Sequence, residues 1–451
     1  MGITALPSRT DQMGAQKSKT VEESDDNSIE DLPDGWLLTS VGELFQIVGG
    51  GTPSTKNPEY WEGDIPWISS ADIYGLKKIV PRRNINLTAI KNSAAHLVPK
   101  GSIIVVTRVS LGRIAMCDTP ISFSQDCHAL IPKTDSIDPE FALFYLSQAV
   151  QTFQSQSRGT TISGVTVKVV SSLPFPLPPL AEQQRIVARV EALLTHINAA
   201  RVPLIRVPLI MRRFRQAVLA AAFNGKLTED LRKEKNNTEM LPEGWKIKKL
   251  RDTTKRALTI KPESEPDRIF GYVDISSINN DMNKISDFKK IRGEDAPSRA
   301  RQSIQPYDVL FSNVRTYLRN IAMVPDDLDV QVCSTGFTVL RSNGTLLPKF
   351  LFYYTLTNDF INVVTPQQTG SNYPATTDRV VKDATIPLPP LAEQHEIIRR
   401  VGLLFERADA FDQEVAAAGR RCERLTQAVL GKAFRGELTT HDSKAPIIHQ
   451  Q

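Results

Sequence analysis

Two long stretches of the chain carry apolar residues at a spacing that alternates between four and three. Each member of the second series lies 211 residues after a member of the first. A seam with an average period of 3.5 residues is typical of two helices wound together as a coiled coil. We therefore predict two long helices, the first over about residues 182–223. The first seam consists of Ile186, Val190, Leu193, Ile197, Ala200, Leu204, Val207, Met211, Phe214, Val218 and Ala221, and the second of Ile397, Val401, Leu404, Ala408, Phe411, Val415, Ala418, Cys422, Leu425 and Val429.

The octapeptide PLPPLAEQ stands before each predicted helix, at 176–183 and again at 387–394. Its prolines are excluded from helix interiors and central strands but suit the residues just before a helix. Its glutamate and glutamine then fall in the first helical turn, where an acidic group complements the helix dipole. Gly225 and Gly436 stand where glycine commonly ends a helix. Each octapeptide therefore predicts a stiff connection between a domain and a long helix.

The pentapeptide RVPLI occurs twice in tandem inside the first predicted helix, at 201–205 and 206–210. Proline removes a backbone donor and clashes with the preceding turn. We therefore expect Pro203 and Pro208 to kink or interrupt the helix.

The region before each helix is also duplicated. LPDGW at 32–36 recurs as LPEGW at 241–245, and residues 99–116 align without gaps on residues 306–323. Short runs rich in β-branched residues, such as 65–73 and 101–109, are typical of strands. These regions predict two diverged copies of one α/β domain.

The repeat gives the domain boundaries and the fold class. We predict a disordered acidic tail over 1–31, an α/β domain over 32–175, a connection and long helix over 176–240, a second domain over 241–386, a second connection and helix over 387–440, and a tail over 441–451. Two equal helices that each follow their own domain pack most simply antiparallel. The expected fold is α/β, with two repeated α/β domains separated by two long helices that form an antiparallel coiled coil. Two similar faces held apart in this way suit a protein that reads a split site.

Charge and composition narrow the class of partner. The net charge is +5, but the first 34 residues sum to −5 and the remainder to +10. A basic body is compatible with a polyanionic partner. The four cysteines form no ligand or disulfide pattern, and no apolar run is long enough to span a bilayer. We therefore expect a cytoplasmic protein without a membrane partner.

The sequence contains no recognisable catalytic motif. The run Gly49-Gly50-Gly51 is followed by Thr52-Pro53-Ser54-Thr55-Lys56, which lacks the Gly-Lys pair of a phosphate-binding loop. The motifs GxSxG and HExxH are missing, and the six histidines have no metal-ligand spacing. His128 follows Asp126 and Cys127, but the second copy does not retain this set, so a structural histidine is the expectation. We assign no catalytic residue and no metal ligand.

Side chains suited to DNA are present in both copies. Arginine binds phosphate or guanine, and Thr, Ser, Asn and Gln suit phosphates and base edges. A polar loop precedes each PLPPLAEQ, at 158–168 and 367–377. The predicted DNA-binding residues are Arg108, Arg113, Arg158, Thr160, Thr161, Ser163 and Lys168 in the first copy, and Arg315, Arg319, Gln368, Thr369, Ser371, Asn372 and Tyr373 in the second.

The order of LP[DE]GW, α/β domain, PLPPLAEQ and a heptad helix ending in FRQAVLAAAFNGKLT, followed by a second round, resembles the DNA-specificity subunits of Type I restriction–modification systems. The resemblance covers residues 32 to about 440. It implies that the α/β units are target recognition domains, each reading one half of a bipartite site in double-stranded DNA. It further implies that the helices space the two domains and bind two methyltransferase subunits, and that restriction subunits complete the complex.

The same resemblance implies that this chain is not an enzyme and has no cofactor of its own. S-adenosylmethionine, ATP and Mg²⁺ are then expected in the partner subunits, which methylate adenine and cleave DNA. Two alternatives remain at this point. One is a coiled-coil scaffold that does not read DNA, and the other is an enzyme with its own active site.

Overall fold

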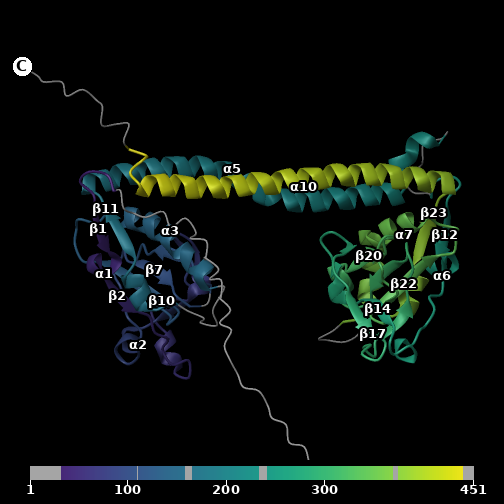
Figure 1. The fold of residues 1–451 in the computed structure, drawn as a ribbon, viewed down its shortest axis with the longest axis horizontal. Helices are drawn as coiled ribbons and strands as arrows, with labels where there is room; N and C mark the ends of the chain where they lie inside the picture. The colour runs from purple at the N-terminus through teal and green to yellow at the C-terminus, as the bar shows by residue number, and fades with distance from the viewer. Residues whose placement is uncertain (1–31, 109, 158–164, 233–240, 369–373, 440–451) are drawn as a thin grey trace, which may run out of the picture. The chain divides into compact units, whose positions relative to one another are not determined.

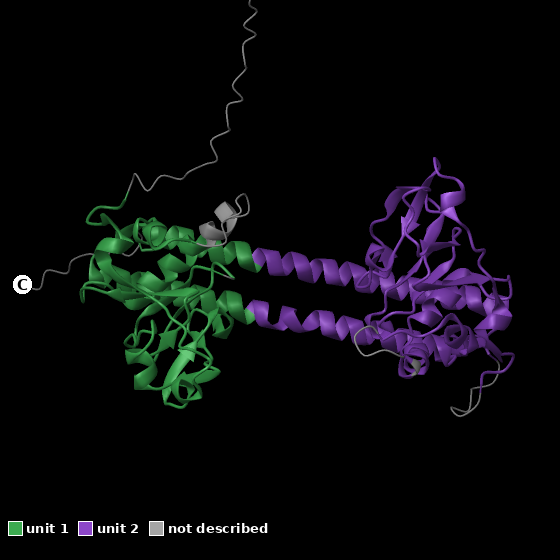
Figure 2. Ribbon diagram, turned by 90° about the horizontal axis from the view of Figure 1, so that it is seen from below, with its two compact units in different colours: residues 1–199, 422–451 green, residues 200–421 purple. Residues whose placement is uncertain are grey.

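The computed structural model describes residues 32–108, 110–157, 165–232, 241–368 and 374–439 (Figure 1). The chain divides into two compact units, residues 1–199 with 422–451 and residues 200–421 (Figure 2). Each unit contains one α/β domain, which we call domain 1 and domain 2 in chain order. Each unit also contains the beginning of the long helix that follows its domain and the end of the other long helix.

The two domains have the same central sheet, as the repeat predicts. In domain 1 the order is β2 (Phe45–Gly49), β10 (Cys127–Pro132), β7 (Ile103–Val106) and β8 (Ile114–Met116). In domain 2 the order is β13 (Thr254–Lys255), β22 (Phe337–Ser342), β19 (Val309–Ser312) and β20 (Ile321–Met323). Neighbouring strands are antiparallel throughout. Strand β7 is completely buried, which explains its run of Ile and Val residues.

A second sheet and a hairpin accompany each central sheet. In domain 1 the second sheet is β6 (Arg83–Ile85), β3 (Ile65–Ile68) and β9 (Ser122–Phe123), and the hairpin is β4 (Ile73–Gly75) with β5 (Lys78–Ile79). In domain 2 the sheet is β17 (Lys289–Arg292), β14 (Ile269–Val273), β21 (Val332–Ser334) and β18 (Ala300–Ser303), and the hairpin is β15 (Ile278–Asn279) with β16 (Lys284–Ile285). The strands expected within 65–73 and 101–109 are confirmed as β3 and β7.

Each domain also contains four α-helices within the described residues. Domain 1 contains α1 (Val41–Leu44), α2 (Leu87–Lys91), α3 (Pro139–Ser157) and α4 (Val167–Ser171). Domain 2 contains α6 (Leu250–Thr253), α7 (Pro348–Thr355), α8 (Asn358–Val364) and α9 (Asp378–Asp383). Helices α3 and α7 both start with a proline, Pro139 and Pro348, and pack on the central sheets.

The octapeptide PLPPLAEQ connects a strand directly to a helix. Its first two residues end β11 (Pro174–Leu177), which pairs with β1 (Leu37–Ser40) in a two-stranded ribbon. The second copy does the same in β23 (Thr385–Leu388), which pairs with β12 (Lys246–Lys249). A strand with one free side tolerates proline, because the missing N–H is not required by a second neighbour.

The long helices are α5 (Leu180–Phe223) and α10 (Leu391–Phe434), each of 44 residues. Both their first and their last residues are separated by the repeat offset of 211, so the predicted equal helices are confirmed. The helix is not interrupted at the RVPLI tandem, because α5 continues through Pro203 and Pro208, and a kink there stays a prediction. Each proline removes one hydrogen bond, and the neighbouring turns of a long helix retain theirs.

Within each unit the two long helices run antiparallel. In the second unit Arg232 contacts Glu393, whereas Arg215, earlier in α5, contacts Asp409 and Asp412, later in α10. In the first unit Thr439, after α10, contacts Glu182 at the start of α5. These pairs confirm the antiparallel arrangement predicted from the sequence.

The predicted seam is only partly buried. Ile186, Val190, Ile397, Val401, Ala408 and Cys422 are buried, but Ala200, Phe214, Phe411 and Leu425 are exposed. The placement of these four residues in the seam is therefore wrong. A contact between only two helices buries a narrow stripe, so residues at its edge remain in solvent.

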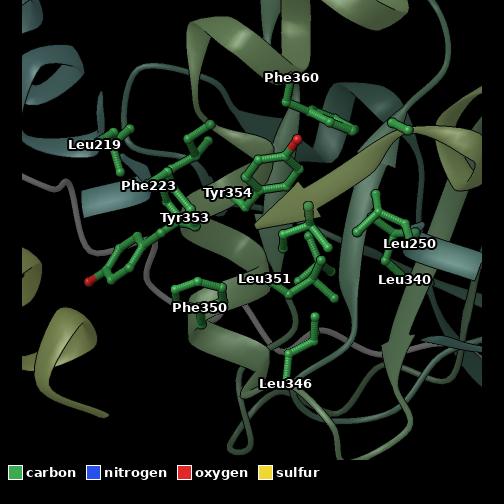
Figure 3. Close-up of a cluster of buried hydrophobic side chains, with 14 of the residues drawn as sticks. Leu219, Phe223, Leu250, Leu340, Leu346, Phe350, Leu351, Tyr353, Tyr354 and Phe360 are labelled. Atoms are coloured by element: carbon green, nitrogen blue, oxygen red, sulfur yellow. The ribbon is translucent and has the colours of Figure 1, made fainter. Parts of the chain in front are cut away.

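The ends of the long helices belong to the domain cores. In the second unit Leu219 and Phe223 of α5 pack with Phe350, Tyr354 and other residues of domain 2 (Figure 3). In the first unit Phe434 of α10 packs edge-on against Phe141 and Tyr145 of domain 1. Burial of one such phenyl ring contributes about 1.5–3 kcal/mol. Each domain is thereby attached to both helices.

Candidate nucleic-acid interface

In domain 1 the end of strand β7 meets the polar loop that precedes PLPPLAEQ. Thr107 and Arg108 follow β7, and their backbone N–H groups donate to the carbonyl of Asp126 at 2.9 and 3.2 Å. The carbonyl of Thr107 accepts from the N–H of Val165 at 2.8 Å. Arg108 is exposed. The end of the polar loop therefore lies beside an exposed arginine.

Domain 2 repeats this arrangement at the end of strand β19. The N–H of Arg315 donates to the carbonyl of Pro374 at 2.8 Å, and the N–H of Thr376 donates to the carbonyl of Asn313 at the same distance. Gln368, at the start of the polar loop, donates to the Thr316 hydroxyl at 2.9 Å. The structure thus brings together Arg315 and Gln368, which the sequence predicts separately.

The guanidinium groups of Arg113 and Arg319 bond to groups of their own domains. The Arg113 guanidinium donates to the carbonyls of Ser70 and Ile73 at 3.0 and 3.4 Å. The Arg319 guanidinium donates to the Leu356 carbonyl at 2.8 Å and to Asn358 Oδ1 at 2.5 Å.

Both of these arginines line a cavity beside the long helices. The cavity at Arg113, of about 600 Å³, is also lined by Leu194 and Leu430. The cavity at Arg319, of about 790 Å³, is also lined by Phe405 and Leu219. Burial and the nearby charge of Arg212 lower the pKa of Arg319.

The remaining predicted residues divide into two groups. Lys168 is exposed on α4. Arg158, Thr160, Thr161, Ser163, Thr369, Ser371, Asn372 and Tyr373 lie outside the described residues. The assignment of DNA contacts to all of these residues stays a prediction.

His128 has a structural environment in domain 1. Its Nδ1 lies 2.8 Å from the hydroxyl of Thr107, so it supports the residue that contacts the polar loop. Burial, together with the charge of Arg108, lowers the pKa of His128. A neutral imidazole can then accept or donate this hydrogen bond without adding charge to the interface.

The turn after β19 is held in an unfavourable backbone conformation. Arg315 and Arg319 have φ values of 48° and 55°, and the 3₁₀ turn Thr316–Leu318 lies between them. A non-glycine residue in this left-handed region costs roughly 1–2 kcal/mol. The Asn280 amide donates to the Leu318 carbonyl at 2.8 Å, which helps to hold the turn. Tyr317 is 53% exposed on it.

The glutamine of each PLPPLAEQ fastens the long helix to its domain. Gln183 is fully buried; its amide donates to the carbonyls of Ser136 and Pro178 at 3.0 and 2.9 Å and accepts from the N–H of Asp138 at 2.8 Å. Gln394 is equally buried and makes the same three kinds of bond, to Thr345, Pro389 and Leu347. Sequence reasoning placed both residues in a first helical turn and missed this function.

The glutamate of each PLPPLAEQ binds the end of the other repeat. Glu393 accepts from the Thr228 hydroxyl at 2.6 Å and from Arg232, which both follow α5, and also from Trp245 Nε1 of its own domain at 2.9 Å. Glu182 accepts from the Thr439 hydroxyl. Thr228 and Thr439 occupy the same position in GKLT and GELT. The repetition of these motifs was visible in the sequence, but the exchange of partners between the repeats was not.

The glycine at the end of each long helix packs on the proline of an LP[DE]GW motif. Gly225 and Gly436 have φ values of 79° and 74°. A Cβ atom on Gly225 would lie 2.4 Å from Cγ of Pro242, and one on Gly436 would lie 2.4 Å from Cγ of Pro33. We call each set of glutamate, glutamine, threonine and glycine contacts a clasp.

The fold and the interface define a class of protein. Two equivalent α/β domains each present a polar loop beside a strand-end arginine, and each is clasped to a long helix pair. Among the described residues there is no group of His, Cys, Asp and Glu side chains that could hold a metal ion. None of the helices within the described ranges is long and apolar enough to cross a membrane. These features are those of a duplicated recognition protein.

Comparison with known proteins gives the family. The model of the Type I restriction modification DNA specificity domain matches twice, at residues 33–202 and 242–409. The chain belongs to this family. Its relatives include the specificity subunits of the Type I restriction enzymes EcoDI from Escherichia coli, 27% identical over 427 residues, and EcoKI from Escherichia coli strain K12, 28% identical over 435 residues. Each match covers 90% of both chains.

A solved structure supports the fold. A chain from a study of complex assembly and conformational transition of the Type I restriction–modification system matches with a TM-score of 0.64 and 23% sequence identity. The match covers 90% of this chain and 99% of the solved chain. The two α/β domains and two long helices are therefore the architecture of this family, as the resemblance predicted.

Proposed function

We propose that this chain is the non-catalytic specificity subunit of a Type I restriction–modification complex and reads a bipartite DNA site, one half with each domain. The observation that carries the proposal is the equivalent contact of strand-end turn and polar loop in both domains, at Thr107 with Val165 and at Asn313 with Thr376. The two domains share one fold but carry different polar residues in their loops, which suits the recognition of two different half-sites. Phosphate contacts then set the register of the duplex, and base contacts select the sequence.

Selection from a DNA library tests this function. The chain, purified with its methyltransferase subunits, is expected to enrich two short half-sites separated by an unselected spacer. Replacing residues 35–175 with the equivalent domain of a relative should change the first half-site and leave the second unchanged. Enrichment of a single continuous sequence would refute the bipartite reading. Binding without any sequence preference would favour the alternative, a coiled-coil scaffold without DNA readout.

We propose further that the partner subunits bind the long helices. Val202, Ile205, Leu209 and Ile210 of α5 are all more than half exposed within nine residues of helix. The first three recur at a spacing of three and four, so they share one face of α5. Exposed apolar patches of this kind are typical of protein–protein contacts. The chemistry of methylation and cleavage, with S-adenosylmethionine, ATP and Mg²⁺, would then belong to the partners.

Co-purification tests this docking surface. Ile205→Arg is expected to reduce recovery of the methyltransferase subunits at least tenfold while the chain stays folded. Ile247→Arg is the matched control, because Ile247 is similarly exposed but lies on strand β12 of domain 2. Equal recovery with both variants would remove the exposed face of α5 as the docking surface.

A further inference from the structure

The glycine run of domain 1 is fixed against the turn that joins β9 to β10. The N–H groups of Gly50 and Gly51 donate to the carbonyls of Cys127 and Phe123 at 3.1 and 2.9 Å. A Cβ atom on Gly50 would lie 2.1 Å from the carbonyl oxygen of Ser124, and one on Gly51 would lie 2.1 Å from that of Ala94. Only glycine allows so close an approach. The run therefore places the following residues, 52–56, at a defined position.

This placement brings a polar segment to the strand-end interface of domain 1. Thr52, Ser54, Thr55 and Lys56 are all exposed. The Thr52 hydroxyl donates to Oε1 of Gln125 at 2.8 Å. Gln125 is itself exposed, and the next residue, Asp126, provides the carbonyl that binds the N–H groups of Thr107 and Arg108. Residues 52–56 and Gln125 therefore border the arginine turn.

The chemistry of this border suits nucleic acid. The segments 49–56, 107–108 and 124–128 contain one acidic residue, Asp126, and two residues with a positive charge, Lys56 and Arg108. Lys56 forms no ion pair with any described carboxylate. The bond from Thr52 orients the Gln125 amide, whose Nε2 donors and second Oε1 lone pair remain available. Glutamine recognises adenine by donating to N7 and accepting from N6.

We propose that Gln125 reads an adenine of the first half-site and that Lys56 binds a backbone phosphate beside it. The proposal rests on the proposed function, since it assigns residues to the DNA contact of domain 1. The glycine run then serves to hold a DNA-binding segment, which accounts for a motif that lacks the residues of a nucleotide-binding loop. Thr52 is a positioning residue, because it acts on DNA only through Gln125.

Two variants separate the two contacts. Gln125→Ala is expected to lower the preference for adenine at one position of the first half-site roughly 5- to 150-fold, with the salt dependence of binding unchanged. Lys56→Ala is expected to weaken binding to all sequences alike and to reduce the slope of log K against log salt by about 0.9. Both are measured on the complex of this chain with its methyltransferase subunits.

Matched controls lie at the other end of the same sheet. Gln46 of β2 and Lys100, before β7, are exposed side chains of the same types. Gln46→Ala and Lys100→Ala are expected to leave both the preference and the slope unchanged. Retention of the second half-site in every variant establishes that the protein is folded and binds DNA.

The outcomes distinguish this inference from the proposed function. If the unaltered complex selects no first half-site, the proposed function itself fails. If it selects one and Gln125→Ala selects the same sequence, the base contact is refuted while the function stands. A slope for Lys56→Ala equal to that of Lys100→Ala refutes the phosphate contact in the same way.

Discussion

Replacing Gln183 tests whether the clasp holds domain 1 on its helix. Gln183→Ala removes all three hydrogen bonds of a fully buried amide. Two carbonyls and the N–H of Asp138 then lose their partner. Each unsatisfied buried group costs about 1–3 kcal/mol, and partial entry of water reduces the sum. We expect the free energy of unfolding of the first unit to fall by about 3–4 kcal/mol.

The assay is thermal unfolding combined with hydrogen exchange. For a unit of this size 1 kcal/mol corresponds to roughly 2–4 °C, so the midpoint of the first unit should fall by about 6–16 °C. The exchange of the Asp138 amide should rise most, because it loses its acceptor. Gln183→Met keeps the volume of the side chain and separates the hydrogen bonds from the effect of a cavity.

The neighbouring residue provides the control. Gln184 follows in the same helical turn but is exposed, so Gln184→Ala is expected to change the midpoint by less than about 1 °C. The reasoning is refuted if Gln183→Met is as stable as Gln184→Ala. It is also refuted if the increase in exchange appears in the second unit rather than around Asp138.

Three further changes probe other contacts. Burial and Arg108 lower the pKa of His128 in the folded protein, whereas in the unfolded chain this pKa is near 6.5. As the pH falls, the unfolded chain therefore binds this proton before the folded protein does. The stability of domain 1 should therefore be constant above about pH 7 and fall as the pH drops below about 6.5, and His128→Asn should lose this component; an identical pH profile would contradict it. Gly225→Ala should destabilise the second unit by at least about 2 kcal/mol, whereas Gly419→Ala, in an open helical position, should stabilise it by about 0.5–1 kcal/mol; equal melting temperatures would contradict this pair. Glu393→Gln removes the carboxylate that faces the buried guanidinium of Arg232, and it should lower the free energy of unfolding, measured in urea, by about 3–5 kcal/mol. A decrease of less than about 1 kcal/mol would contradict this.

The repeat made most of the fold predictable. An offset of 211 shared by seams, octapeptides and helix ends gave the two long helices, their equal lengths and their order relative to the domains. It could not predict which seam residues are buried, because heptad spacing identifies one face of a helix but not the width of the contact on that face. Phe411 and Leu425 have the right spacing and still face solvent. Nor could the low helix propensity of proline show that α5 continues through Pro203. The proline removes one backbone hydrogen bond, and the neighbouring turns of the helix keep theirs.

The candidate site was less predictable, because it depends on contacts between distant segments. The strand-end arginines and the polar loops were predicted from the sequence as separate features. Their meeting, through Thr107 with Val165 and Thr316 with Gln368, is set by the sheet and by the return of the chain. Arg113 and Arg319 are of the same residue type as Arg108 and Arg315, which they follow by five and four residues. Only the structure shows that the guanidinium groups of Arg113 and Arg319 bond to carbonyls of their own domains.

The two clasps have a topological consequence. In the second unit the chain passes covalently from the end of α5 to domain 2, while Gly225 packs on Pro242. In the first unit the same contact, between Gly436 and Pro33, joins the two extremities of the described fold without a peptide bond. The repeats thus form a closed cycle in which neither comes first. We expect a circular permutant, with the first and last residues joined and a new break in the segment 232–241, to retain both clasps. The two possible orders of the repeats along the chain are then equivalent for the fold.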